Sequence, residues 1–514
     1  MTSATTRSKS GMASIAGPLA FGVVGSLATL VFVSSVKAPL LWLELGVLFG
    51  LGLWFLLRDA GRQKFEFLSV KNCFIVVYLL EFGAGTISQM LGMNSMLPAI
   101  HTWGDQQTLV ALAYCIVGLL CFGAAYYSRL GPAASSALPR FAEGGDVGRA
   151  AAMIALLSLA SFASVYALMT HFGSIEYYLT HVEIIRATEF TGVGYLLYGV
   201  YLIPKAFLVC YGLSLSKRRF EVAALILFLS SIIVGVLAGL RAEMFEAIAY
   251  AFLVRHYSGF KIQLGPKILA AAMAAYLASS VYVLYRIHPA DTVSRQLAVT
   301  ADAISHGELT KGDALAVFAR FNGLASVVRV LDRLPEVGHT WGKDNLIDLI
   351  TMPIPRFLWP NKPLPAPVKF NQEFYPEIPY EMTSTGAAAA TTSVGELTWM
   401  FGLPGVMGGL FLIGLYCRAI GHYLATARSA PVAVLASLSS FYALLMNEMF
   451  ELQVIQFLIY GGLLVFVMRW VYPVDKATIR LAPARRAVTR NPFTTERTRR
   501  PSRQNEGKLP ANSV

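Results

Sequence analysis

Long apolar runs separated by short charged segments dominate this chain. A helix that crosses a bilayer needs about 20 mostly apolar residues, because each residue adds about 1.5 Å of rise. The pattern predicts twelve such spans, the eighth of which is short for an unaided crossing. The spans cover residues 15–36, 38–57, 72–93, 107–127, 150–170, 191–213, 222–240, 241–254, 268–285, 396–417, 430–450 and 452–469. The predicted fold class is therefore all-α: a polytopic membrane protein with about 12 transmembrane helices.

The composition agrees with this pattern and excludes several classes of protein. Of the 514 residues 55% are hydrophobic and only 14% are charged, whereas a soluble chain carries about 25% charged residues. So few charges exclude an ordinary cytosolic enzyme, a secreted disulfide scaffold and a nucleic-acid-binding module. The five cysteines fall within predicted spans and form no CxxC pair or Cys/His cluster, so we expect no metal site and no cofactor.

The positions of the cations predict the orientation in the membrane. Lys and Arg gather in alternate connections, and the positive-inside rule places those connections on the cytoplasmic side. Both termini are then cytosolic, and the first apolar run is kept as a helix. Much of the net charge of +12 lies in the Pro-containing tail, which we interpret as disordered. This tail is either solvated or lies on anionic lipid or a partner protein.

One long polar segment interrupts the series of spans. The predicted organisation is a cytosolic N-terminus (1–14), helices one to nine (15–285), a large outer, periplasmic loop (286–395), helices ten to twelve (396–470) and the tail (471–514). The layout does not divide into two equal halves, which argues against the common transporter folds.

The large loop itself contains helical and extended patterns. Apolar residues at helical spacing predict an amphipathic helix over 311–334, which lies on the membrane or packs over the spans. A second helix is expected from Asp344, as N-cap, to Thr351. Six prolines within 353–367 then predict a stiff, extended, non-helical stretch.

The Pro-rich stretch carries residues suited to binding a phosphorylated sugar. Arg356 offers a planar fork that matches phosphate oxygens, and Lys362 adds a compact charge. Trp341 and Trp359 offer flat apolar faces on which a sugar ring can rest. The alternative is a Pro-rich lid whose cations meet lipid headgroups.

Two groups of ionisable residues lie at the ends of spans. Glu396 lies at the outer mouth of the tenth span, where a carboxylate could accept a proton from a hydroxyl group. The alternative is an acid favoured there by the helix dipole. Arg241 lies at the junction of spans seven and eight, beside Glu243 and Glu246. This group predicts either an anion site or a structural Arg–Glu pair.

The spacing of these residues resembles one known family. The two motifs are Pro355-Arg356-x-x-Trp359-Pro-x-Lys362-Pro363 and, about thirty residues later, Gly395-Glu396-x-x-x-x-Phe401-Gly402. This pattern is similar to that of the bacterial oligosaccharide repeat-unit polymerases, the Wzy-type O-antigen polymerases. The specific resemblance covers about 350–402; elsewhere it is one of topology, with many spans and a late outer loop.

The resemblance implies a fold and an activity. It implies a GT-C-like glycosyltransferase of the bacterial inner membrane that acts without a metal ion. Such an enzyme moves a growing glycan from undecaprenyl diphosphate to the next lipid-linked repeat unit, in O-antigen, capsule or exopolysaccharide biosynthesis. Its expected partners are the lipid-linked oligosaccharide, membrane lipid, and the flippase and chain-length regulator of the same pathway.

The resemblance also implies roles for the candidate residues. The departing diphosphate needs fixed cations, for which Arg356, Lys362 and Arg241 are candidates. The acceptor hydroxyl needs a base, for which Glu396 is the first candidate and Glu243 the second. The sugar-binding candidates are Trp341 and Trp359.

Two other functions remain open. An O-antigen ligase has similar topology and the same donor but a different acceptor, and its outer-loop histidine has possible counterparts in His288, His306 and His339. A secondary transporter or flippase of lipid-linked sugars is the other alternative, although the missing two-fold division argues against it.

Overall fold

Helices are the only regular secondary structure in the described residues of the computed structural model. The chain comprises one unit at Met1–Val474 and a second at Asp475–Val514, and every described residue belongs to the first. The structure describes residues 39–59, 68–90, 105–141, 144–188, 194–238, 241–260, 281–282, 285, 290–306, 323–351, 354, 358–359, 361–377, 391–427, 429–447 and 450–473.

Within these residues, eight helical segments are long and apolar enough to cross a membrane. This finding supports the predicted class, a helical membrane protein with several spans. The segments are formed by α2 (Pro39–Leu57), α3 (Val70–Leu79) with η1 (Leu80–Ala84) and α4 (Gly85–Met90), α5 (Asp105–Tyr126), α7 (Val147–His171), α9 (Gly194–Val200) with α10 (Leu202–Ser214), η3 (Arg218–Phe220) with α11 (Glu221–Leu237), α20 (Ser393–Thr426) and α22 (Phe450–Val471).

The remaining four predicted spans have different outcomes. The span 15–36 lies outside the described residues, and of the span 268–285 only residues 281–282 and 285 are described. The eighth span is a helix of 17 residues, α12 (Arg241–Tyr257), rather than the 14 predicted, and it is not among the eight long apolar segments. The eleventh is α21 (Ala430–Leu445), apolar but only 16 residues long. The count of twelve and the GT-C-like arrangement therefore stay predictions.

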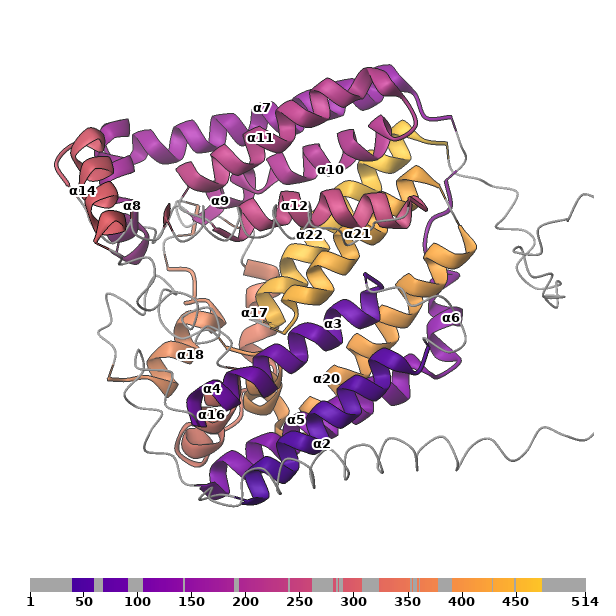
Figure 1. Cartoon of the computed structure of the whole chain (residues 1–514), viewed down its shortest axis with the longest axis vertical. Coiled ribbons are helices and arrows are strands. Elements are labelled where there is room, and N and C mark those ends of the chain that lie inside the picture. Colours follow the sequence, from indigo (N-terminus) through magenta and orange to yellow (C-terminus); the bar gives the residue numbers. More distant parts are fainter. Residues whose placement is uncertain are drawn as a thin grey trace, which may run out of the picture. The chain divides into compact units, whose positions relative to one another are not determined.

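The helices pack into two groups that share α21. One buried apolar cluster joins α7, α9, α10, α11, α12 and α22, and a second joins α2, α3, α5 and α20. Figure 1 shows α7, α10, α11 and α12 in the upper part of the view, α2, α3, α5 and α20 in the lower part, and α21 and α22 between them. Helix α21 contributes Val434 and Leu438 to the first cluster and Ala436 and Ala443 to the second. Different faces of α21 thus pack against the two groups and hold them together.

The predicted large loop contains four described helices: α14 (Val293–Ser305), α16 (Gly323–Val337), α17 (Lys343–Thr351) and α18 (Ala366–Phe374). The predicted amphipathic helix is confirmed where it is described, and it runs on to Val337; residues 311–322 lie outside the description. Of its two predicted placements, packing over the spans is the one observed, because α16 contacts α5 and α20.

Two details of the loop were predicted wrongly. Asp344 is not an N-cap, because α17 already begins at Lys343. The Pro-rich stretch was expected to exclude helix as far as residue 367, but α18 begins at Ala366 with Pro367 in its first turn. Proline is tolerated there because the first turn has no partner for its N–H groups.

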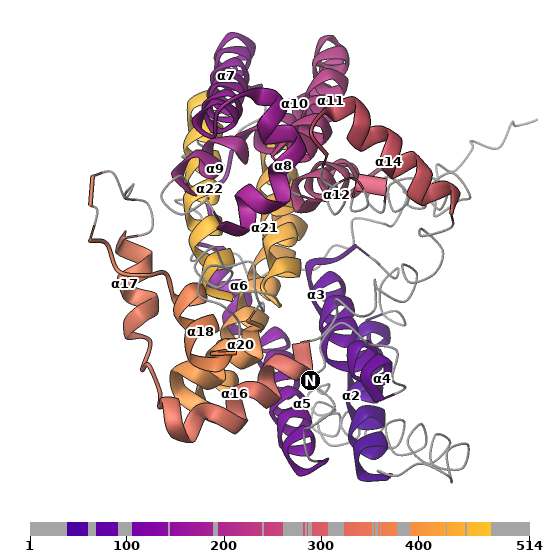
Figure 2. The same ribbon diagram turned by 90° about the vertical axis from the view of Figure 1, so that its left-hand side faces the viewer.

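The loop helices form a layer over the ends of the second group. Phe370 and Phe374 of α18 pack with Val330 of α16 and with Trp399 of α20 in a small apolar cluster of their own. Arg329 of α16 donates to both carboxylate oxygens of Glu377 at 2.8 Å. Figure 2 shows α16, α17 and α18 gathered beside α20. The layer is thus fixed to the helix that carries Glu396.

Candidate active site

The start of α20 places Glu396 inside the protein. Thr392 caps this helix, since its hydroxyl accepts from the N–H of Gly395 at 3.1 Å. Glu396 follows in the first turn and is only 4% exposed. Gly395 allows the close approach of α16, because a Cβ there would lie 3.2 Å from the Ser326 hydroxyl oxygen. The local sequence therefore buries the carboxylate beneath the loop layer.

The carboxylate of Glu396 is held by groups from three segments. Its Oε1 accepts from the backbone N–H of Glu451 at 3.0 Å and from Asn345 Nδ2 at 3.3 Å. Its Oε2 accepts from the Thr391 hydroxyl at 3.3 Å. Glu451 lies in the first turn of α22, so Glu396 meets the positive ends of two helix dipoles. Glu396 therefore lies where the dipole of α20 favours an acid. It is also bound by groups from α17 and α22, which the helix-dipole interpretation does not include.

Other acids surround this carboxylate. Asn345 Nδ2 also donates to the side chain of Glu451, so one amide bridges the two glutamates. The carboxylate of Asp348, one turn further along α17, acts electrostatically on both of them. All three acids are buried. In the part of the chain that the structure describes, they do not form a group suited to hold a metal ion.

The second motif ends at a break in α20. Gly402 has φ 66° and ψ −151°, a conformation that essentially only glycine adopts. The break frees carbonyl groups, and loop residues donate to them: His339 Nδ1 lies 3.1 Å from the carbonyl oxygen of Trp399, and the Trp341 N–H donates to Met400 at 3.1 Å. The loop segment before α17 is therefore hydrogen-bonded directly to the helix that carries Glu396.

The two candidate sugar-binding tryptophans keep exposed faces. Trp341 is 69% exposed and has φ 53°, an unusual value for a bulky residue, and its ring lies 6.3 Å from that of Phe401. Trp359 is 40% exposed. Both rings are therefore accessible, and Trp341 is positioned by the same break that follows Glu396.

The candidate cations are only partly described. Lys362 Nζ donates to the carbonyl of Ile354 at 3.1 Å, so its ammonium group links two parts of the Pro-rich stretch. Arg356 lies outside the described residues. Arg241 and Glu243 begin α12, but their side chains lie outside the description. No described contact brings Lys362 to Glu396.

An ion pair joins α17 and α18 near the site. Lys369 of α18 donates to Asp344 of α17 at 2.5 Å. Burial, and then the charge of Asp344, raise the pKa of Glu373. Burial also raises the pKa of Tyr375 to about 12. The ion pair holds α18 to the helix that supplies Asn345 and Asp348.

Asn345 and Asp348 were not predicted from the sequence. They lie three positions apart on one face of α17, and that spacing is the only signal they leave in the sequence. Glu451 was not predicted as a neighbour of Glu396 either, although its N–H donates to that carboxylate. Glu246, one of the two acids that the sequence placed beside Arg241, binds Lys205 at 2.5 Å and the hydroxyl of Tyr250.

Comparison of this chain with protein-family models, with curated proteins and with solved structures finds no match. The fold and the site therefore define the class only as a helical membrane protein with a buried carboxylate cluster beneath a helical loop layer.

Proposed function

We propose that this protein is a polysaccharide polymerase, a membrane-embedded glycosyltransferase that extends a glycan carried on undecaprenyl diphosphate. The observation that supports this proposal is the environment of Glu396. Its carboxylate is buried and accepts a hydrogen bond from Asn345 of the loop layer. The helix break that positions Trp341 follows six residues later. The motif resemblance supplies the reaction class.

In the proposed reaction, Glu396 takes the proton of the acceptor hydroxyl as that oxygen attacks the anomeric carbon of the donor sugar. The bond from this carbon to the diphosphate oxygen breaks, and the electron pair leaves with undecaprenyl diphosphate. Thr391, Asn345 and the N–H of Glu451 hold the carboxylate in one orientation. A group fixed in this way loses little entropy at the moment of proton transfer.

The remaining candidates complete the proposal. The exposed rings of Trp341 and Trp359 would support the sugars, and Arg356, Lys362 and Arg241 would take up charge on the departing diphosphate. The acids near Glu396, which are Asp348 and Glu451, would also bind the sugars, because carboxylate oxygens accept hydrogen bonds from hydroxyl groups.

The test is complementation of a deletion strain, with the surface glycans separated on a gel. The deletion should leave one repeat unit on its acceptor, and the wild-type chain should restore the ladder. Glu396→Gln, expressed at the normal level, should lower polymer formation by about 10²- to 10⁴-fold, the usual contribution of a general base. Glu221→Gln, which alters an exposed first-turn acid of α11, should restore a normal ladder. A full-length ladder from Glu396→Gln would place the site elsewhere.

An O-antigen ligase is the second candidate, favoured by one observation. His339 bonds to the carbonyl of Trp399, and its ring lies 5.5 Å from that of Trp341, so a loop histidine borders the same site. The same deletion separates the two functions, because loss of a ligase should leave long polymer on the lipid carrier.

A further inference from the structure

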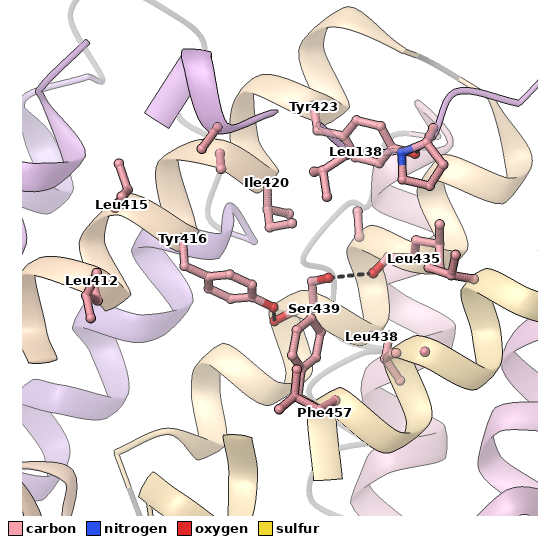
Figure 3. A pocket seen from close by; sticks show the side chains of 18 residues that line it. Leu138, Leu412, Leu415, Tyr416, Ile420, Tyr423, Leu435, Leu438, Ser439 and Phe457 are labelled. Carbon is pink, nitrogen blue, oxygen red and sulfur yellow. Dashed lines mark hydrogen bonds between the residues drawn. The ribbon is translucent and has the colours of Figure 1, made fainter. Parts of the chain in front are cut away.

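A second feature lies far along α20 from Glu396. A cavity of about 520 Å³ opens between α20, α21, α22 and the segment around α6 (Leu130–Ser135). Figure 3 shows the side chains of Leu412, Ile420, Leu438 and Phe457, which line the cavity. Its size is within the range of about 300–1,000 Å³ that is typical of small-molecule sites.

The wall of this cavity is apolar in character. Three lining residues carry hydroxyl groups, and each hydroxyl is already bonded to a backbone carbonyl: Tyr416 to Ser439, Ser439 to Leu435 and Tyr423 to Pro139, at 3.0, 2.8 and 2.5 Å. Figure 3 shows Tyr416 directed at Ser439. The wall thus offers hydrocarbon contacts, which suit an alkyl chain and not a sugar.

The cavity opens toward the outer surface of the helices. Leu412 of α20 and Leu458 of α22 border it and are 62% and 52% exposed. Both belong to segments that are long and apolar enough to cross a membrane. An alkyl chain could therefore enter sideways, between α20 and α22.

Positive charge gathers at one end of the cavity. Pro139 and Tyr423 form that end, and Arg140 follows directly and acts electrostatically on Tyr423. Arg140 and Arg418 both act on the ring of His422. The Nε–H of Arg418 is buried and has no hydrogen-bond partner in the described part of the chain. An anionic group at this end would meet a complementary charge.

We propose that this cavity binds one acyl chain of an anionic phospholipid, with the lipid phosphate beside Arg140. Basic residues next to an apolar groove between membrane helices are the features that recognise such a lipid. The proposal does not depend on the glycosyltransferase function, because the cavity shares no residue with the Glu396 site.

Glycines on α20 and α22 provide a matched pair of variants. Gly462 lines the cavity, and a Cβ there would meet nothing within 4 Å, so Gly462→Phe should fill the space. Gly408 has equally open surroundings but does not line the cavity, so Gly408→Phe is the control. Arg140→Gln removes the charge and leaves the cavity intact.

The experiment uses the full chain in nanodiscs made of equal parts phosphatidylglycerol and phosphatidylcholine. The protein is then extracted into detergent, and retained lipid is measured by native mass spectrometry. Wild type and Gly408→Phe should retain phosphatidylglycerol preferentially, and Gly462→Phe should lower its retention about tenfold. Arg140→Gln should lower the preference for phosphatidylglycerol about fivefold, as expected for one cation.

Several outcomes would overturn the proposal. These are equal retention of both lipids by the wild type, unchanged retention by Gly462→Phe, or unchanged preference in Arg140→Gln. A shift of Gly462→Phe from dimer to monomer, without any change in bound lipid, would show instead that a second copy of the chain fills the cavity. The Arg140→Gln comparison decides the matter even if Gly462→Phe fails to fold.

Discussion

Gly402 allows the break in α20 at which the loop layer contacts this helix. Gly402 has φ 66° and ψ −151°, and a Cβ there would lie 3.4 Å from the His339 ring. We expect Gly402→Ala to cost about 1–3 kcal/mol, because alanine must adopt a sparsely allowed conformation or close the break. The measurement is the melting temperature of the purified protein in detergent.

The control for this variant is Gly408→Ala in the same helix. Its Cβ would meet nothing within 4 Å, and alanine favours a helix interior by up to about 1 kcal/mol. This control should melt at or slightly above the temperature of the wild type. If Gly402→Ala melts with it, the break at Gly402 does not require glycine.

At the residue scale, the sequence was sufficient to find Glu396 but not its partners. An acid at the start of a helix is visible in a one-dimensional pattern. The contacts from Asn345 and Glu451 come from 51 and 55 positions away, and nothing local encodes them. The same limit applies to Glu246, because its partner Lys205 lies 41 positions away and nothing local encodes the pair.

At the scale of elements, α10 and α12 are joined by a buried ion pair. Lys205 Nζ lies 2.5 Å from Glu246 Oε1, and both side chains are less than 5% exposed. The ammonium group also lies 4.5 Å from the centre of the Tyr460 ring. Lys205→Met should cost about 3–5 kcal/mol, because it leaves the charge of Glu246 buried without an opposite charge beside it. Thermal melting in detergent gives the size of this loss.

The double variant Lys205→Met/Glu246→Gln tests the physical cause. It removes both charges, and glutamine can still accept from the hydroxyl of Tyr250. Most of the lost stability should return, because the cost comes from the unpaired charge rather than from lost packing. A double variant as unstable as Lys205→Met would assign the effect to packing around Lys205.

The sequence predicted long elements better than short ones. Every predicted span that falls on described residues is a helix, because runs of about 20 apolar residues have few other solutions. Helices α14 and α18 were missed, since short polar helices depend on packing more than on local pattern. In α18, for example, Phe370 and Phe374 pack against Trp399 of α20.

At the scale of the whole chain, the two proposed sites lie toward opposite ends of one helix. Glu396 is in the first turn of α20, and Tyr423 of the cavity is in its last turn. The part of α20 after the break at Gly402, residues 403–426, is about 36 Å long at 1.5 Å per residue, enough to cross a bilayer. The proposed orientation puts Glu396 on the periplasmic side and the cavity in the cytoplasmic half.

Labelling of single cysteines tests this orientation. Lys343 of α17 and Ser136, just after α6, are both exposed, so Lys343→Cys and Ser136→Cys present thiols at the two predicted faces. The native cysteines are buried or partly buried, and the parent protein serves as the blank. A membrane-impermeant maleimide should label Lys343→Cys in intact spheroplasts and Ser136→Cys only after permeabilisation. The reverse pattern would put Glu396 on the cytoplasmic side, where a lipid-linked repeat unit exported by the flippase could not reach it.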